Sequence, residues 1–271
     1  MSKILYILGT GYCGSTVLEI CLGVHQDIVN VGEVNRVLHY TNKDEFDKLY
    51  FLDESKNSLC SCGKKMGDCD YWRGFYDILV KNLDKPFAKK YQLHYDYFCK
   101  RYPDKIMIDS SKSLSSLKEV KNGAMGGVML PLLLTKDVRS WTTSVQKKHG
   151  GSSIKRYIRW YIEAKKFTNF LKDHTHLKVG YEEFALFPEK IIQMVCKNLK
   201  IEFDEKMLIP SNSKGHLVFS NRMRYDKNKM SKIFYDYRWF QNNSLNIASS
   251  IMPFVMKLNN ELVYSNNIGI S

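Results

Sequence analysis

The feature that most constrains the fold of this chain is a glycine-rich turn between an apolar run and a helical pattern. The apolar run is Ile4–Leu8, the turn covers residues 9–16, and residues 17–22 have helical spacing. A strand, a glycine-rich turn and a helix in this order bind phosphate, because backbone N–H groups and a helix N-terminus face the anion. The spacing is G-x-x-x-x-G-[ST]-[ST], with Ser15 where nucleoside triphosphatases carry lysine. We therefore expect a nucleotide phosphate site that is not built to split a triphosphate.

Apolar runs bounded by turn residues alternate with segments of helical spacing along the chain. Strands that alternate with helices predict a parallel sheet covered by helices on both faces. The expected fold is therefore α/β, a P-loop-like three-layer α/β/α arrangement with a central parallel sheet. Pro131 lies within the fourth run, where its missing N–H cannot join a sheet ladder. The predicted strands are residues 4–8, 28–31, 106–108, 128–135 and 177–179.

The chain shows no repeat, no low-complexity tract and no linker, so residues 1–271 are predicted to form a single domain. Residues 42–70 are polar and contain cysteines, which indicates an insertion on the surface. Residues 150–153 are predicted to form a turn and residues 209–228 a functional loop. The predicted helices are residues 15–24, 71–83, 113–121, 138–149, 154–172, 188–199 and 243–258.

The charge balance favours an anionic ligand. The chain has 41 Lys and Arg against 28 Asp and Glu, a formal net charge of +13. Positive excess of this kind suits an anionic small molecule, nucleic acid or an anionic polymer, and it does not choose among them. No apolar run approaches the roughly 20 residues of a membrane span, and the first is too short for a signal peptide. With seven cysteines, an odd number, we expect a cytoplasmic protein with mostly reduced thiols.

Polar residues follow each predicted strand. Ligands of open parallel sheets bind beyond the carboxyl ends of the strands, so these residues are expected to converge on one edge. Carboxylates, several cations and hydroxyls and an aromatic ring would then meet there. After the glycine turn, the groups concerned are Glu33, Asp109, Ser110, Ser111, Lys112, Lys136, Arg139 and Tyr181.

Five stretches between Ile4 and about Trp239 resemble sulfotransferases that use 3′-phosphoadenosine 5′-phosphosulfate (PAPS). The first is the turn itself, which is similar to the family's 5′-phosphosulfate loop, written R-S-G-S-T or K-S-G-T-T. The last three positions match, whereas a tyrosine replaces the leading cation and a cysteine replaces the next serine. The resemblance implies that the following residues bind the phosphosulfate: Gly11, Tyr12, Cys13, Gly14, Ser15 and Thr16.

The second and third stretches imply the catalytic residues. Residues 31–36 resemble the G-E motif of tyrosylprotein and some carbohydrate sulfotransferases, which implies that Glu33 is the base that accepts the acceptor's proton. The alternative is a glutamate at a helix N-terminus that interacts with the helix dipole. Residues 108–112 are similar to a D-S-S-K segment of bacterial members, which implies that Lys112 neutralises charge on the leaving oxygens. The alternative is a helix-capping run with an exposed lysine.

The fourth stretch resembles the signature R-D-x-R-x-x-x-x-S, which holds the 3′-phosphate of the nucleotide. The resemblance implies this role for Lys136, Arg139 and Ser144, with Lys136 in place of the usual arginine. A lysine offers a point charge instead of a bidentate fork. The alternative is a solvated helix start.

The fifth stretch, residues 179–184, resembles the family's Y-E-D-L-x-x-x-P segment and implies that Tyr181 lies near the adenine. A core aromatic residue is the alternative. Residues 216–224 are similar to an H-x-x-x-G-N-x-x-R loop of bacterial members, with Ser220 in place of the glycine. This similarity implies that Arg224 closes over the 3′-phosphate and that Asn221 shapes the loop.

Three cysteines follow the pattern C-x-C-G-x₅-C-x₂-W, which recurs in bacterial sulfotransferase-like chains. Cys60, Cys62 and Cys69 have no neighbouring histidine, so they make an incomplete structural zinc site. Cys99 is a distant candidate for a fourth ligand. Reduced, packed cysteines are the favoured interpretation, and no metal ligands are predicted.

The resemblance implies transfer of a sulfuryl group from PAPS to a hydroxyl or amine acceptor, with 3′,5′-ADP as the product and no metal required. A saccharide or a small metabolite is the expected acceptor, nucleic acid is not favoured as a partner, and the oligomeric state is left open. One alternative is a P-loop nucleotide kinase-like enzyme, against which the missing lysine counts. The other is an anion-binding protein with impaired catalysis.

Overall fold

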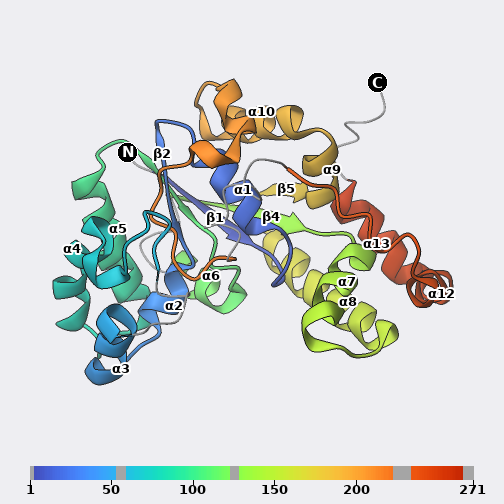
Figure 1. Ribbon diagram of the computed structural model, residues 1–271, viewed down its shortest axis with the longest axis horizontal. Helices are drawn as coiled ribbons and strands as arrows, with labels where there is room; N and C mark the ends of the chain where they lie inside the picture. Colours follow the sequence, from blue (N-terminus) through green and yellow to red (C-terminus); the bar gives the residue numbers. More distant parts are fainter. Residues whose placement is uncertain (1–2, 53–58, 123–127, 222–232, 265–271) are drawn as a thin grey trace. The chain divides into compact units, whose positions relative to one another are not determined.

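The computed structural model describes residues 3–52, 59–122, 128–221 and 233–264 (Figure 1). These residues form one five-stranded sheet in the order β2-β3-β1-β4-β5, and the pairs β2–β3, β1–β3 and β4–β5 are parallel. The predicted α/β fold with a central parallel sheet is thereby confirmed. The strands are β1 (Ile4–Leu8), β2 (Ile28–Gly32), β3 (Ile106–Asp109), β4 (Met129–Thr135) and β5 (Leu177–Gly180).

The strands are buried, as expected for a parallel sheet covered on both faces. All residues of β1 and β3 are buried, which explains why β1 is a continuous apolar run with no alternation. Pro131 lies within β4 just before the register with β5 begins, at the pair Leu132–Leu177.

Contacts within the chain divide it into two compact units, which we call unit 1 and unit 2. Unit 1 comprises Met1–Ile7, Thr16–Leu130 and Ile209–Lys232. Unit 2 comprises Leu8–Ser15, Pro131–Leu208 and Ile233–Ser271. Each unit is therefore assembled from segments that are far apart in the sequence.

Unit 1 packs its helices around α5. Helix α5 contacts α2, α4 and α6. Helix α3 begins where the Asn42 side chain accepts from two backbone N–H groups, and α6 begins where Ser113 accepts from Ser116. The helices are α1 (Ser15–Leu22, whose first residue belongs to unit 2), α2 (Val34–Leu38), α3 (Lys43–Asp47), α4 (Asp70–Val80), α5 (Phe87–Arg101) and α6 (Leu114–Lys121), with short η1 (Lys48–Leu52), η2 (Met66–Asp68) and η4 (Pro210–Asn212).

Unit 2 packs its helices around α8, which contacts α7, α12 and α13; Figure 1 draws α12 and α13 in red. Helix α7 begins at the cap Asp137, whose carboxylate accepts from the N–H of Arg139, and it ends at Gly150 with φ of +59°. The helices are α7 (Val138–His149), α8 (Ser153–Leu171), α9 (Tyr181–Leu186), α10 (Pro188–Leu199), α12 (Asn243–Ile251) and α13 (Pro253–Val263), with short η3 (Glu205–Leu208).

Three of the differences between the structure and the predicted elements concern longer segments. The predicted helix over residues 243–258 is two helices, because Pro253 has no N–H and cannot continue α12, but it fits the first turn of α13. Helix α5 was not predicted, since its buried face includes the polar Lys90 and His94. The segment 42–70 is more than a surface insertion, because its aromatic residues Phe46 and Tyr50 are buried.

None of the helices among the described residues is long and apolar enough to cross a membrane.

Candidate active site

The glycine-rich turn of unit 2 is held in place by close backbone packing. A Cβ atom on Gly9 would overlap the carbonyl oxygen of Leu134, and one on Gly14 would overlap the ring of Tyr181. Gly14 also has φ of +91°, in the region that favours glycine. The indole N–H of Trp141 donates to the carbonyl of Gly11 at 2.7 Å. Glycine is thus required where the turn meets β4 and α9, and Gly11 itself has open space around it.

Tyr12, which stands at the position of the expected cation, contacts basic residues of α7. Its backbone has φ of +70°. Its hydroxyl lies 2.8 Å from Nε2 of His149, and the ammonium of Lys148 lies 5.7 Å from the centre of its ring. The positive charge beside the turn is therefore that of Lys148, which belongs to α7 and not to the turn itself.

Lys136 follows β4 and is the centre of a buried polar cluster in unit 2. Its ammonium donates to Ser144 Oγ at 3.2 Å and to the Asp236 carboxylate at 3.0 Å, and it lies 5.1 Å from the centre of the Tyr181 ring. Arg238 also pairs with Asp236, at 2.6 Å, and reaches Ser144 Oγ at 3.5 Å. Two cations, a hydroxyl and an aromatic face therefore surround one carboxylate. We call these five residues the Lys136 cluster.

The two cations keep the Asp236 carboxylate charged. Burial opposes its ionisation, but hydrogen bonds from Arg238 and the charge of Lys136 hold the pKa of Asp236 well below its usual range. Asp236 and Arg238 were not predicted from the sequence. The only local signal in the sequence was an arginine two residues after an aspartate. Asp236 lies 100 residues from Lys136 along the chain, so no local pattern indicated that the two side chains meet.

Arg139 belongs to a second buried network of unit 2. Its guanidinium makes two hydrogen bonds to the Asp137 carboxylate, at 2.9 and 2.6 Å, and lies 3.8 Å from the centre of the Trp239 ring. Burial opposes ionisation of Asp137, yet the bonds from Arg139 and Asn259 hold its pKa below its usual range. Burial and the charge of Asp137 raise the pKa of Glu182 to about 8. Arg139 is thus engaged in an ion pair at the start of α7.

Glu33 and Lys112 form an ion pair in unit 1, where the ends of β2 and β3 lie side by side. Lys112 Nζ donates to Glu33 Oε1 at 2.8 Å and to the carbonyl of Ser110 at 2.7 Å, and both side chains of the pair are 14% exposed. Arg36 is a weaker partner of Glu33, at 3.5 Å. Glu33 precedes α2 but its side chain makes no cap bond. Glu33 does stand at the start of α2, where the alternative of an interaction with the helix dipole places it. The residue that caps α6 is Ser113, and Lys112 is largely buried, unlike the exposed lysine of the alternative.

Two buried carboxylates lie behind this pair. Glu19 accepts from the N–H of Gly32 at 2.8 Å and from the Ser110 hydroxyl at 2.6 Å, and burial raises its pKa to about 8. Asp109 accepts from the Tyr91 hydroxyl at 2.8 Å, and burial raises its pKa to about 6. Glu19 therefore ties the ends of β2 and β3 together, and Asp109 links the end of β3 to α5.

Replacing Glu19 with glutamine is expected to flatten the pH dependence of stability. The folded protein keeps a proton on Glu19 that the unfolded chain, with the ordinary pKa of 4.5, releases between pH 4.5 and about 8. Because the folded state binds more protons there, the free energy of unfolding falls as pH rises, by up to about 1.4 kcal/mol per pH unit from this group. A carboxamide keeps both contacts, accepting from Gly32 and donating to Ser110.

Urea unfolding of the Glu19→Gln variant at several pH values in this range checks the expectation. The exposed Glu119→Gln variant on α6 is the matched control and should keep the wild-type slope. A Glu19→Gln slope equal to that of the wild type would contradict the assignment of a buried, protonated glutamic acid.

The segment that carries Asn221 lies along the end of β2 in unit 1. Val218 forms a parallel bridge with Gly32 and accepts from the N–H of Glu33 at 3.1 Å. A Cβ on Gly32, whose φ is +80°, would overlap Val218. The N–H of Asn221 donates to Thr16 Oγ1 at 3.2 Å, which links the segment to α1. Arg224 lies outside the described residues.

Solved structures of two sulfotransferase domains are similar to this chain over nearly its full length. The sulfotransferase domain of the olefin synthase from Synechococcus PCC 7002 has a TM-score of 0.64 and 16% identity, and the match covers 93% of this chain and 96% of that one. The chain has the sulfotransferase fold. The sulfotransferase domain from the curacin biosynthetic pathway likewise has a TM-score of 0.64, with 15% identity over 93% of this chain and 98% of that one. No family model and no curated protein matches the sequence.

Within the sulfotransferase fold, the predicted residues fall into two groups. Unit 2 brings Lys136 and Ser144 to Tyr181, whose ring also packs on Gly14 of the turn. Tyr181 is therefore both buried and in contact with the predicted phosphate-binding residues. Unit 1 pairs the two predicted catalytic residues with each other. Their roles in binding and transfer are developed below as a proposal.

Proposed function

We propose that the protein is a sulfotransferase that moves a sulfuryl group from PAPS to a hydroxyl or amine acceptor and releases 3′,5′-ADP. The Lys136 cluster carries the proposal, because it joins two cations and a hydroxyl to the glycine-rich turn through Tyr181. The sulfotransferase fold supports it.

The Lys136 cluster has the chemistry of a phosphate site. Lys136, Arg238 and, at 3.5 Å, Ser144 all direct donors at the Asp236 carboxylate. Donors that bind a carboxylate, two of them charged, also suit a phosphate. In the proposal these three donors bind the 3′-phosphate and Tyr181 lies against the adenine. In this proposal Arg238 adds the fork of donors that Lys136 lacks in place of the usual arginine.

The turn would hold the 5′-phosphosulfate through its backbone N–H groups and the start of α1. Gly11 to Thr16 supply these groups. Lys148, which lies against the Tyr12 ring, supplies positive charge that the family places in the turn. The lysine missing at Ser15 is the one that contacts the β- and γ-phosphates of a triphosphate, so its absence suits PAPS.

The Glu33–Lys112 pair is assigned to the transfer step. PAPS supplies a sulfuryl group whose S–O bond to the 5′-phosphate breaks. Glu33 accepts the proton of the acceptor hydroxyl as its oxygen forms the new bond to sulfur. Lys112 neutralises the charge that grows on the leaving phosphate oxygen. The products are the sulfated acceptor, 3′,5′-ADP and a proton first held by Glu33, and the charge neutralisation needs no added Mg²⁺.

Ligand binding and turnover test the proposal together. At a concentration a hundred times its dissociation constant, 3′,5′-ADP is expected to stabilise the folded protein by about 2.7 kcal/mol, with a clear rise in melting temperature. ATP with Mg²⁺ serves as the comparison. Transfer from radiolabelled PAPS to saccharides and small hydroxyl or amine metabolites, without added divalent cation, then identifies the acceptor class.

Each outcome decides between the candidate functions. Stabilisation by 3′,5′-ADP with label transfer supports the sulfotransferase. Stabilisation by ATP with Mg²⁺ alone would replace it with a kinase. Binding of 3′,5′-ADP without transfer to any acceptor would support an anion-binding protein with impaired catalysis.

A further inference from the structure

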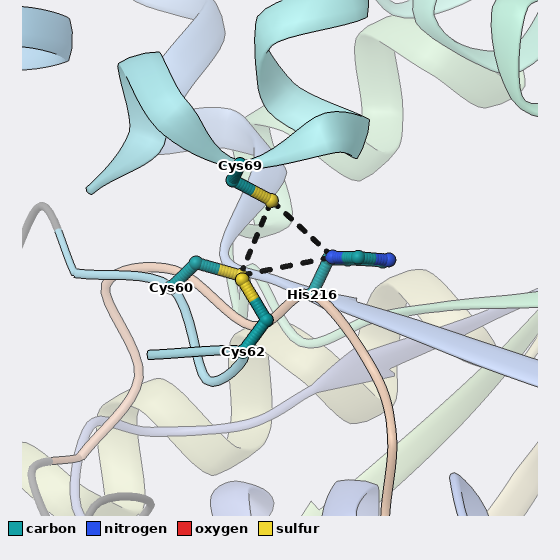
Figure 2. Close-up of side chains that lie close together, drawn as sticks. All are labelled: Cys60, Cys62, Cys69 and His216. Carbon is teal, nitrogen blue, oxygen red and sulfur yellow. Dashed lines mark hydrogen bonds between the residues drawn. The ribbon is translucent and has the colours of Figure 1, made fainter. Parts of the chain in front are cut away.

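Three cysteine thiols and one histidine imidazole converge in unit 1. They form a cluster of their own, distinct from the ion pair of Glu33 and Lys112. Figure 2 shows the side chains of Cys60, Cys62, Cys69 and His216 directed toward one point. Their sulfur and nitrogen atoms all lie within 4.8 Å of one another. The sequence offered Cys99 as a distant fourth donor, but the fourth donor in the structure is His216. We call these four residues the four-donor cluster.

The spacing of the donor atoms matches the edges of a tetrahedral zinc site. Zinc bond lengths of about 2.3 Å to sulfur and 2.0–2.1 Å to nitrogen give edges of about 3.8 Å between two sulfurs and about 3.5–3.6 Å between sulfur and nitrogen. Cys69 Sγ lies 3.6 Å from Cys60 Sγ. His216 Nδ1 lies 3.3 Å from Cys69 Sγ and 3.8 Å from Cys60 Sγ. Three of the four donors are thus already spaced as in such a site, and Cys62 Sγ lies within 4.8 Å of each of them.

We propose that the four-donor cluster is a structural zinc site with three cysteine ligands and one histidine ligand. Four protein ligands fill a tetrahedral site and leave no open position, so the ion would hold the chain together and take no part in transfer. The proposal goes beyond the sulfotransferase function and does not depend on it.

The local chain is shaped to present the thiols. Gly63, with φ of +86°, turns the chain after Cys62, and its N–H donates to the carbonyl of Cys60 at 3.0 Å. Zinc binds the thiolate form of cysteine, and this turn holds the sulfur atoms of Cys60 and Cys62 within 4.8 Å of each other.

The imidazole of His216 is fixed by partners outside the cluster. Its Nε2 lies 3.2 Å from the Tyr102 hydroxyl, its ring stacks on Tyr71 at 5.3 Å, and its carbonyl accepts from the Trp72 indole at 2.8 Å. An outer hydrogen bond at Nε2 leaves Nδ1 to face the thiols, which is the usual arrangement of a histidine that binds metal. Packed free thiols would not require this orientation.

A disulfide accounts for less of the geometry. A bond between Cys60 and Cys69 needs the sulfurs at about 2.05 Å, whereas they lie 3.6 Å apart. A disulfide between Cys60 and Cys69 would also not account for Cys62 and His216, whose side chains point to the same place. Zinc uses all four donors.

The ion would fasten the segment that carries His216 and Asn221 to the loop that carries Cys60 and Cys69. Cys60 and His216 are 156 residues apart in the chain, so one cross-link removes much conformational freedom from the unfolded state. The N–H of His216 donates to the carbonyl of Asn30 at 2.8 Å, and Val218 follows with its contact to Glu33. The site therefore fixes the segment that borders the proposed base.

Metal analysis of the full chain tests the proposal. Protein purified without chelators or metal-affinity resin is expected to contain about one zinc ion per chain. The variants Cys69→Ser and His216→Ala are expected to lower this content to about a tenth or less. Cys99→Ser removes a thiol outside the cluster and should keep the wild-type content. Because the measured quantity is bound metal, a protein without sulfuryl transfer still tests the site.

The wild-type chain provides a test that does not depend on the variants folding. After zinc is removed in denaturant and the chain is refolded with Co²⁺, the visible and thiolate charge-transfer absorption of a tetrahedral cobalt site is expected. Two results would overturn the proposal. One is wild-type protein from zinc-supplemented cells that contains no zinc and shows no cobalt spectrum. The other is a Cys60–Cys69 disulfide in the purified protein.

Discussion

Glu33→Gln is expected to lower the rate of sulfuryl transfer by about 100- to 10,000-fold, the usual contribution of a general base. The carboxamide cannot accept the acceptor's proton at working pH. It retains an oxygen that accepts from Lys112, which is 2.8 Å away in the structure, so folding and nucleotide binding should be preserved. The measurements are kcat with a fixed acceptor and the dissociation constant of 3′,5′-ADP.

Arg36→Gln is the matched control for this variant. Arg36 is the exposed partner of Glu33 at 3.5 Å, and exposed ion pairs contribute only about 0–1 kcal/mol. Its loss should therefore leave kcat close to that of the wild type. A Glu33→Gln variant that folds, binds 3′,5′-ADP and turns over at the wild-type rate would remove Glu33 from the role of base.

Lys136→Met is expected to weaken binding of 3′,5′-ADP by about 10- to 100-fold, because a hydrogen bond to a charged group contributes about 1.5–3 kcal/mol. Methionine keeps much of the lysine volume in a position that is 8% exposed. Asp236 stays paired through Arg238, so no buried charge is left alone. Affinity for 5′-AMP, which lacks the 3′-phosphate, should change little.

Asp236→Asn tests the same cluster in the opposite direction. Removing the carboxylate frees Lys136 and Arg238 for the phosphate and removes a like charge, so affinity for 3′,5′-ADP should rise while affinity for 5′-AMP stays constant. Titration calorimetry with both nucleotides measures the difference. Equal weakening of both nucleotides by Lys136→Met would show that the cluster supports the fold and does not bind the 3′-phosphate.

Much of the fold could be predicted because its signals are local. Continuous apolar runs mark the buried parallel strands, and β1 matches its prediction residue for residue. The break at Pro253 was missed, although a proline that starts α13 is itself a local signal. Helix α5 was missed for a different reason, because tertiary packing buries its Lys90 against carbonyl oxygens of Tyr40 and Leu83.

The amino-acid sequence by itself determined the glycine turn, the alternation of strands and helices and the close spacing of Cys60 and Cys62. These depend on backbone geometry and on periodicity over a few residues. Only the tertiary structure decided that His216 completes the four-donor cluster, 147 residues from Cys69, and that Asp236 meets Lys136. Such partners are chosen by how the elements pack, and no local pattern records which distant side chain will face a given thiol or ammonium.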